Sequence, residues 1–180
     1  MSEGTLEPAG FFEFDLARGA VRARGGERVL LVPDTVLGPL VASAVQAGDL
    51  TVLRRLGRQL GEQARAGLGD PSSRSVADVF GRLADLLALF GWGHLEIERW
   101  GPALLARLEE APGLDDGFLA VAALLGGLIS ATSGHEVACV PVDQEGSFLV
   151  VHPSIAQEVW KWARAGDGVA SIVGRLEVGS

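Results

Sequence analysis

Residues 117–131 read GFLAVAALLGGLISA, a stretch that is apolar on nearly every side when it is wound into a helix. A helix of this kind must lie inside a folded protein or a membrane. Its longest uninterrupted apolar run, Phe118 to Ile129, is shorter than the ~20 residues that a membrane-spanning helix needs. The stretch therefore predicts the most buried helix of a soluble domain, around which the other elements pack.

Short strand-like segments on both sides of this helix predict an antiparallel sheet. Upstream, residues 95–97 alternate apolar and charged side chains, and residues 103–108 are expected to form a second strand. Downstream, residues 137–142 and 148–151 flank a polar turn and predict a hairpin. Two strand pairs joined by a helix indicate an α+β domain, with an antiparallel sheet of about four strands covered by helices.

Amphipathic patterns and capping residues predict the remaining helices. They cover residues 34–47, a segment that starts after Asp49, a segment opened by Ser75 and Asp78, and a segment opened by Ser154 and Gln157. Phe12, Phe14 and Leu16 alternate with polar neighbours, which indicates a strand before the main domain. We therefore expect an N-terminal extension (1–27), one domain (28–165) and a C-terminal tail (166–180).

Composition restricts the compartment and the partners. The 180 residues suit one domain, and the net charge of -8 argues against binding to nucleic acid or to anionic membranes. Cys139 is the single cysteine, so no internal disulfide can form, and the N-terminus lacks the pattern of a secretory signal. The abundance of Arg, Ala, Gly and Leu is typical of a GC-rich bacterial genome. We expect a cytoplasmic bacterial protein that is not inserted in a membrane.

Residues that carry chemistry do not form a recognisable catalytic or metal-binding set. His94, His135 and His152 show no metal-ligand spacing, and His135 and Cys139 would be roughly 13 Å apart on a strand at ~3.3 Å per residue. The sequence contains no nucleophile elbow, Walker motif or dinucleotide-binding loop. We therefore expect no catalytic residues, no metal and no cofactor, and interpret the chain as a non-enzyme.

Three segments, in this order and spacing, resemble one protein family. They are Leu56-Gly57-Arg58-Gln59-Leu60-Gly61, the helix-to-strand turn in residues 89–97, and the end of the apolar helix at residues 126–131, followed by the hairpin. Together they resemble the 4-vinyl-reductase-type domain, which is related to the Bet-three-like subunits of the TRAPP vesicle-tethering complex. The resemblance spans residues 28–152.

The resemblance implies a helix-covered antiparallel sheet, frequent homodimers or heterodimers, and an internal apolar pocket. Some members are sensors of aromatic effectors, and others are tethering subunits. Metal-binding members carry several cysteines in the terminal hairpin, whereas Cys139 is the single candidate here, so a structural zinc does not transfer.

Aromatic and apolar residues around the apolar helix are the candidates for a ligand pocket beneath it: Phe80, Phe90, Trp92, Phe118 and Leu125. Trp92, between two glycines, can form a pocket wall, because its indole can stack on a ligand and donate one hydrogen bond. The alternative, which we prefer slightly, is that it fills the core under the turn.

Candidate interface residues are Gly57, Gly61 and Trp160. Gly57 and Gly61 are one helical turn apart, which favours a close intramolecular helix contact, with a dimer contact as the alternative. Trp160 and Trp162 are separated by about 200° on a helix, so we expect that one faces the sheet and the other a partner or solvent.

The leading functional hypothesis is a non-enzymatic module that binds a small hydrophobic or aromatic ligand and acts through dimerisation or a partner protein. The alternative is a constitutive TRAPP-like scaffold without a ligand. A ligand-binding module needs an open cavity, whereas the glycine-rich apolar helix favours close packing.

Overall fold

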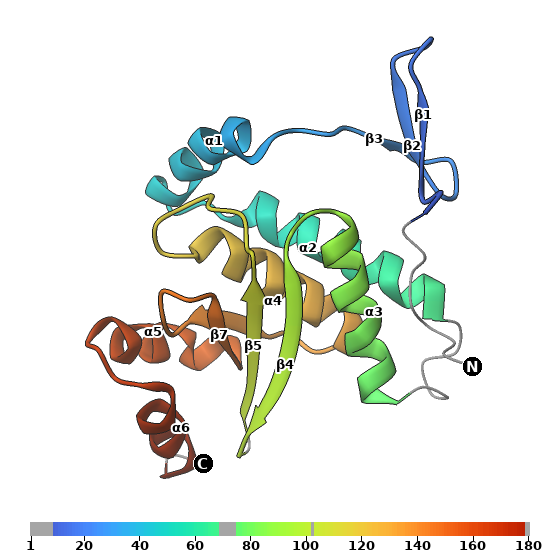
Figure 1. Cartoon of the computed structure of the whole chain (residues 1–180). Coiled ribbons are helices and arrows are strands. Elements are labelled where there is room, and N and C mark those ends of the chain that lie inside the picture. Colours follow the sequence, from blue (N-terminus) through green and yellow to red (C-terminus); the bar gives the residue numbers. More distant parts are fainter. Residues whose placement is uncertain (1–8, 69–74, 102, 179–180) are drawn as a thin grey trace.

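The computed structural model describes residues 9–68, 75–101 and 103–178. The helices are α1 (Asp34–Gln46), α2 (Thr51–Leu68), α3 (Val76–Leu89), α4 (Leu119–Ser133), α5 (Ala156–Arg164) and α6 (Val169–Val178), with the 3-10 turn η2 at Pro153–Ile155. The strands are β1 (Phe12–Asp15), β2 (Ala20–Ala23), β3 (Arg28–Val29), β4 (His94–Trp100), β5 (Ala103–Glu109), β6 (Ala138–Pro141) and β7 (Ser147–Val151). Figure 1 shows a helix-and-sheet body from which the β1–β2 hairpin projects.

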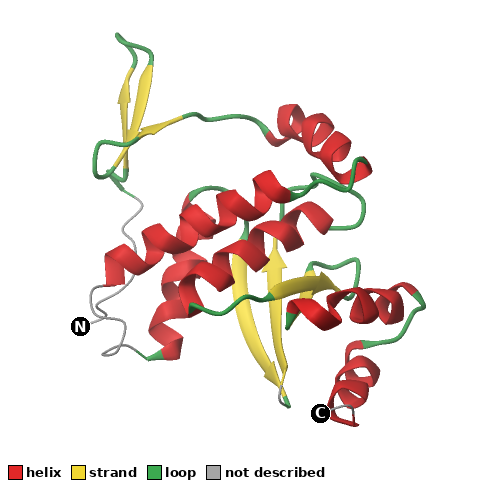
Figure 2. Ribbon diagram, turned by 180° about the vertical axis from the view of Figure 1, so that it is seen from behind, coloured by secondary structure: helices red, strands yellow, loops and turns green. Residues whose placement is uncertain are grey.

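The main sheet confirms the predicted α+β class. Its four strands are antiparallel and lie in the order β4-β5-β7-β6, so the two predicted strand pairs join through β5 and β7. Alternate residues face opposite sides, as the pleat requires. Ala106 and Phe148 belong to the cluster shared with α2, α3 and α4, whereas Leu105 and Leu149 belong to the cluster shared with α5 and α6. Helices therefore cover both faces (Figure 2).

The helix α4 is the most buried, as its all-round apolar sequence predicts. Every position from Ala120 to Ser130 except Ala123 is buried. The helix begins after Phe118, and Asp115 stabilises this end because its carboxylate accepts hydrogen bonds from the backbone N–H groups of Leu119 (2.8 Å) and Ala120 (3.1 Å). A sharp turn with Phe118 at φ 54° thus leads the chain from the sheet into the core.

Glycines allow α2 and α4 to pack with their backbones in contact. A Cβ atom at Gly57 would overlap the carbonyl oxygen of Leu124, and one at Gly61 would lie 2.5 Å from the carbonyl oxygen of Leu128. The contact is reciprocal, since a Cβ at Gly127 would overlap the carbonyl oxygen of Arg54. Gly57 and Gly61 therefore make the close intramolecular contact that the sequence favoured, and both are buried.

Arg54 ties the same helix pair to the start of the hairpin. Its guanidinium donates hydrogen bonds to a carboxylate oxygen of Glu136 (2.8 Å) and to the carbonyl oxygen of Val137 (2.9 Å). Arg58 donates to the other oxygen of Glu136. The hydrogen bonds from Arg58 and Arg54 lower the pKa of Glu136, because they favour its charged form.

The N-terminal residues form a separate small sheet. Strands β1, β2 and β3 are antiparallel in that order, so the predicted extension (1–27) contains two strands in its described part. The sheet touches the body through edge-to-face contacts of Phe11 and Phe12 with Phe90, at centroid distances of 6.2 and 5.8 Å. Residues 30–33, which we call the strap, then cross from β3 to α1 (Figure 1).

The C-terminal region differs from the sequence prediction in two ways. Residues 169–178, placed in the predicted tail, form α6, whose Ile172 is fully buried against Val159 of α5. Ser154 does not cap α5; it lies in η2, where the ring nitrogen of His152 accepts a hydrogen bond from the Ser154 backbone N–H (3.3 Å). An additional turn therefore precedes α5.

Because α6 covers α5, the expected division between Trp160 and Trp162 was wrong. Both rings are half-buried against the cluster shared with α5 and α6. The guanidinium of Arg164 lies 5.6 Å from the Trp160 ring centroid, and that of Arg175 lies 5.2 Å from the Trp162 centroid. Arg175 of α6 thus covers part of the Trp162 ring, although the sequence predicted that one of the two rings would face a partner or solvent.

Among the described residues, no single helix has the length and apolar composition to cross a membrane; α1 and α2 pass that test only as a pair bent by 118°.

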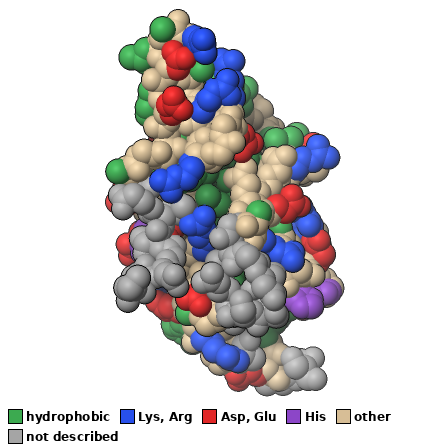
Figure 3. All heavy atoms as spheres, turned by 90° about the vertical axis from the view of Figure 1, so that its right-hand side faces the viewer, with side chains coloured by type: hydrophobic (Ala, Val, Ile, Leu, Met, Phe, Trp, Pro, Cys, Tyr) green, Lys and Arg blue, Asp and Glu red, His purple; other side chains and the backbone are tan. Residues whose placement is uncertain are grey.

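On the face shown in Figure 3, cationic and anionic side chains are interspersed among the described residues and form no basic patch there.

Replacing Gly57 with alanine tests the backbone contact between α2 and α4. We expect the free energy of unfolding to fall by about 2 kcal/mol or more, because the new methyl group forces two backbones apart. Gly81→Ala is the matched control: Gly81 lies inside α3 with open space where a Cβ would be, so alanine should leave stability unchanged or raise it by up to ~1 kcal/mol. Urea unfolding measures both, and equal effects would show that the contact is not tight.

Candidate functional site

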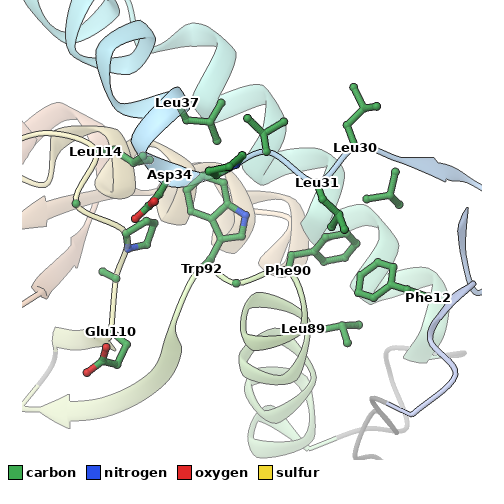
Figure 4. A pocket seen from close by; sticks show the side chains of 17 residues that line it. Phe12, Leu30, Leu31, Asp34, Leu37, Leu89, Phe90, Trp92, Glu110 and Leu114 are labelled. Carbon is green, nitrogen blue, oxygen red and sulfur yellow. The ribbon is translucent and has the colours of Figure 1, made fainter. Parts of the chain in front are cut away.

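A cavity of about 830 Å³ opens between the strap and the body. Its walls come from the start of β1, the strap, the start of α1, the turn after α3 and the loop from β5 to α4 (Figure 4). The side chains are largely apolar, and those labelled in Figure 4 are Phe12, Leu30, Leu31, Asp34, Leu37, Leu89, Phe90, Trp92, Glu110 and Leu114. A concave, mostly apolar surface with a few polar groups is typical of small-molecule sites.

Trp92 stands at the centre of this cavity because of the glycines beside it. Gly91 and Gly93 have φ angles of 73° and 107°, which side chains other than glycine rarely adopt. Gly93 also passes so close to the carbonyl oxygen of Glu109 that a Cβ would overlap it. The turn from α3 into β4 is therefore sharp, and it holds the half-buried indole towards the strap.

The indole nitrogen of Trp92 has an unused hydrogen-bond donor. Its Nε1 donates to no group among the described residues, whereas Nε1 of Trp100, at the other end of β4, donates to Glu98 (3.1 Å). The Trp92 site thus offers an apolar ring face that can stack on an aromatic ligand, and one directional donor that can bind an acceptor group where the ligand carries one.

A second cavity of about 530 Å³ lies on the other side of β3 and the strap, against α2. It shares four lining residues with the first: Val29, Leu30, Phe90 and Trp92. The strap therefore separates two hollows that have one aromatic wall in common. Its own side chains are largely uncovered, with Leu30 and Leu31 exposed by 77% and 62%.

Two carboxylates line the larger cavity. Asp34 begins α1, and one of its oxygens accepts a hydrogen bond from the backbone N–H of Thr35 (2.7 Å). In Figure 4 its carboxylate is directed into the space beside Trp92, whereas the carboxylate of Glu110 points away from the tryptophan. No lysine, arginine or histidine is among the described residues that line this cavity.

The candidate ligand residues divide between the cavity and the core. Phe90 and Trp92 line both cavities. Phe80 packs against the main core, Phe118 meets Phe148 edge to face at 6.1 Å, and Leu125 is fully buried. The structure thus brings two of the candidates together beneath the strap, whereas Leu125 lies inside the core around α4 and Phe80 and Phe118 are partly buried against it.

Several lining residues were not indicated by the sequence. Phe12, Asp34 and the strap come from segments far from Trp92 in the chain. The apolar run Val29-Leu30-Leu31-Val32, directly before the predicted helix, was the one signal that could have pointed to them, because such a run in a loop has no core of its own.

The candidate interface residues lie in two different environments. Gly57 and Gly61 are buried against α4, so a second copy could reach them only if the two helices separated. Trp160 is half-buried on α5, and the guanidinium of Arg164 lies over its ring. Of the three, Trp160 is the one whose surface a partner can contact.

The groups that could carry metal or nucleophilic chemistry are dispersed. In the described ranges, no three side chains of His, Cys, Asp or Glu lie together in a way that could hold an ion. Cys139 is buried in β6, and burial raises the pKa of its thiol to about 12, against a smaller lowering by the charge of Arg54. A thiol in this setting is neutral and inert.

Comparison with solved structures finds chains of similar fold. The chain is similar in structure to the phenol-responsive sensory domain of the transcription activator PoxR, solved with phenol, with a TM-score of 0.59 and 15% sequence identity. The superposition covers 88% of this chain and 90% of that one. No family model and no curated protein matches the sequence. The match establishes a shared fold, and the resemblance to the 4-vinyl-reductase-type family stays a prediction.

The buried thiol predicts slow labelling. At pH 8, Cys139 should react with a disulfide reagent at least about 100-fold more slowly in the folded protein than in urea, because both access and the thiolate fraction are low. The release of the coloured thiolate measures the rate. Rapid stoichiometric labelling without denaturant would show that β6 opens readily or that the thiol is exposed.

Proposed function

We propose that this protein is a non-enzymatic sensory module that binds a small aromatic molecule in the cavity beneath the strap. The observation that carries the proposal is the half-buried indole of Trp92, whose N–H has no partner among the described residues, at the centre of an apolar cavity of about 830 Å³. A single aromatic ring fills only part of such a space, so the strap would close around it or the ligand would be larger than one ring.

The structural likeness supports this proposal independently. A domain with the same fold over 88% of this chain responds to phenol and was solved with it. Phenol has an aromatic face for the indole and an oxygen that can accept a hydrogen bond from Nε1. It is therefore the natural first test ligand.

The strap gives binding a route to the rest of the molecule. Leu30 and Leu31 are exposed, yet they line the cavity, so a bound ring would bury apolar surface on the strap and on Trp92 together. If the ligand binds more tightly when the strap lies against the body than when it is detached, binding stabilises the attached state by that difference in affinity. The N-terminal sheet and α1, which hold the two ends of the strap, would then become more firmly attached.

A second candidate function, a protein-binding scaffold, is favoured by the exposed apolar side chains of the strap and α1: Leu30, Leu31, Val32, Val36 and Leu40. Apolar surface of this kind marks protein interaction sites as well as ligand sites. Native mass spectrometry separates the two. A small-molecule adduct supports the sensor, and an empty dimer that takes up no phenol supports the scaffold.

Titration of the protein with phenol tests the sensory role. We expect binding in isothermal titration calorimetry, and we expect Trp92→Phe to weaken it about three- to tenfold, because the ring remains but one hydrogen bond of roughly 1 kcal/mol is lost. Trp100→Phe is the matched control, since Trp100 lies at the far end of β4 and lines neither cavity.

Two outcomes would contradict the proposal. One is an absence of phenol binding by the unaltered protein at millimolar concentrations. The other is an equal affinity in the unaltered protein and in Trp92→Phe, which would place the ligand elsewhere.

A further inference from the structure

We propose that the cavity beneath the strap prefers aromatic ligands that carry a cationic amine and disfavours aromatic carboxylates, and that Asp34 makes this distinction. This inference rests on the proposed function, because it specifies which ligands the same cavity accepts. It concerns the charge of the ligand, whereas the indole of Trp92 recognises the ring.

The lining of the cavity is electrostatically one-sided. Its ionisable residues in the described part of the chain are Asp34 and Glu110, both acidic. The whole protein carries a net charge of -8, so the long-range field also attracts cations and repels anions. An anionic ligand would find no positive side chain among these lining residues to balance its charge.

Asp34 is the carboxylate that can contact a ligand. Figure 4 shows it directed into the open space beside Trp92, on the α1 side of the cavity. Its Oδ1 accepts a hydrogen bond from Thr35, and its Oδ2 accepts none from the described residues. One oxygen therefore holds the side chain in place, and the other is available to an ammonium or hydroxyl donor.

The position of Asp34 also removes the feature that would otherwise attract an anion. The N-terminus of a helix carries a partial positive charge and free N–H groups, which favour phosphates and carboxylates. At the start of α1 the protein's own carboxylate occupies this position and accepts the hydrogen bond of Thr35. The helix end is thus already neutralised, and the surplus charge faces the cavity.

The indole strengthens the preference for a cation. An ammonium group close to the face of a tryptophan is attracted by the negative face of the ring, in addition to its attraction to a carboxylate. A benzyl-type amine would lay its ring against Trp92 and direct its ammonium group to Asp34 on the α1 side of the indole. A benzoate in the same pose would bring two carboxylates together.

Three probes of nearly equal size test the inference by calorimetry at low salt: benzylammonium, benzyl alcohol and benzoate. We expect benzylammonium to bind about fivefold more tightly than benzyl alcohol, and benzoate at least about fivefold more weakly, since exposed charge pairs have modest effects. Added salt should reduce both differences, because it screens the charges.

Asp34→Asn should bring benzylammonium to within about twofold of benzyl alcohol, whose own affinity should change by less than about twofold. Asparagine retains a side-chain oxygen that can accept the Thr35 hydrogen bond, so the start of α1 should keep this contact. Glu110→Gln is the matched control: it removes the same charge from the same lining, at a side chain that points away, and should preserve the roughly fivefold preference.

The inference is overturned if the unaltered protein binds all three probes equally, or if Glu110→Gln abolishes the preference as fully as Asp34→Asn. In both cases binding of benzyl alcohol and phenol would leave the proposed sensory function standing. If neither phenol nor any of the three probes binds, the sensory function itself fails and the inference fails with it.

Discussion

The structure depends on the contact between α2 and α4, where two helix backbones meet with no side chains between them. At Gly57 and Gly61 on one helix and at Gly127 on the other, no room is left for even a single methyl group. Carbonyl groups of one helix consequently lie against the glycines of the other, at a distance that larger residues exclude. This approach lets α4 be surrounded completely, which its apolar sequence requires.

The same contact determines where the cavity lies. Since α2 is held against α4, the side of α2 that carries Leu56 and Leu60 forms one wall of the smaller hollow. The Gly-Trp-Gly turn brings Trp92 up between that wall and the loop before α4. The cavity is thus built on the rigid part of the fold, and its outer boundary is the strap, which has few contacts of its own. This arrangement suits a binding site, because the packed body can hold the ligand in place and the exposed strap can adjust to it.

The sequence predicted the elements whose signals are local. The capping box of Ser75 and Asp78 and the alternation in β4 were sufficient, since periodicity and caps act within a few residues. The helix α6 was missed because its apolar residues gain a partner only when α5 is in place. Phe90 and Trp92 were suggested by the turn between them. Asp34 could not be connected to them, because nothing local places the start of one helix beside the end of another.

Candidates such as Leu125 show the complementary difficulty: an apolar residue that lines a cavity and one that fills a core have the same sequence signature. In this protein the residues that line the cavity are distinguished from those of the core by their position beside the strap. The strap is joined to the N-terminal sheet by β3 and to the body by α1. Between these two ends its apolar side chains are exposed. Exposed apolar surface costs free energy in water. Binding of a ligand or partner that covers the strap is therefore stabilised by the burial of this surface, in addition to the specific contacts that the ligand or partner makes. The strap, Trp92 and the start of α1 line the same cavity, and for this reason the two candidate functions, although they differ in occupant, concern one surface of the protein.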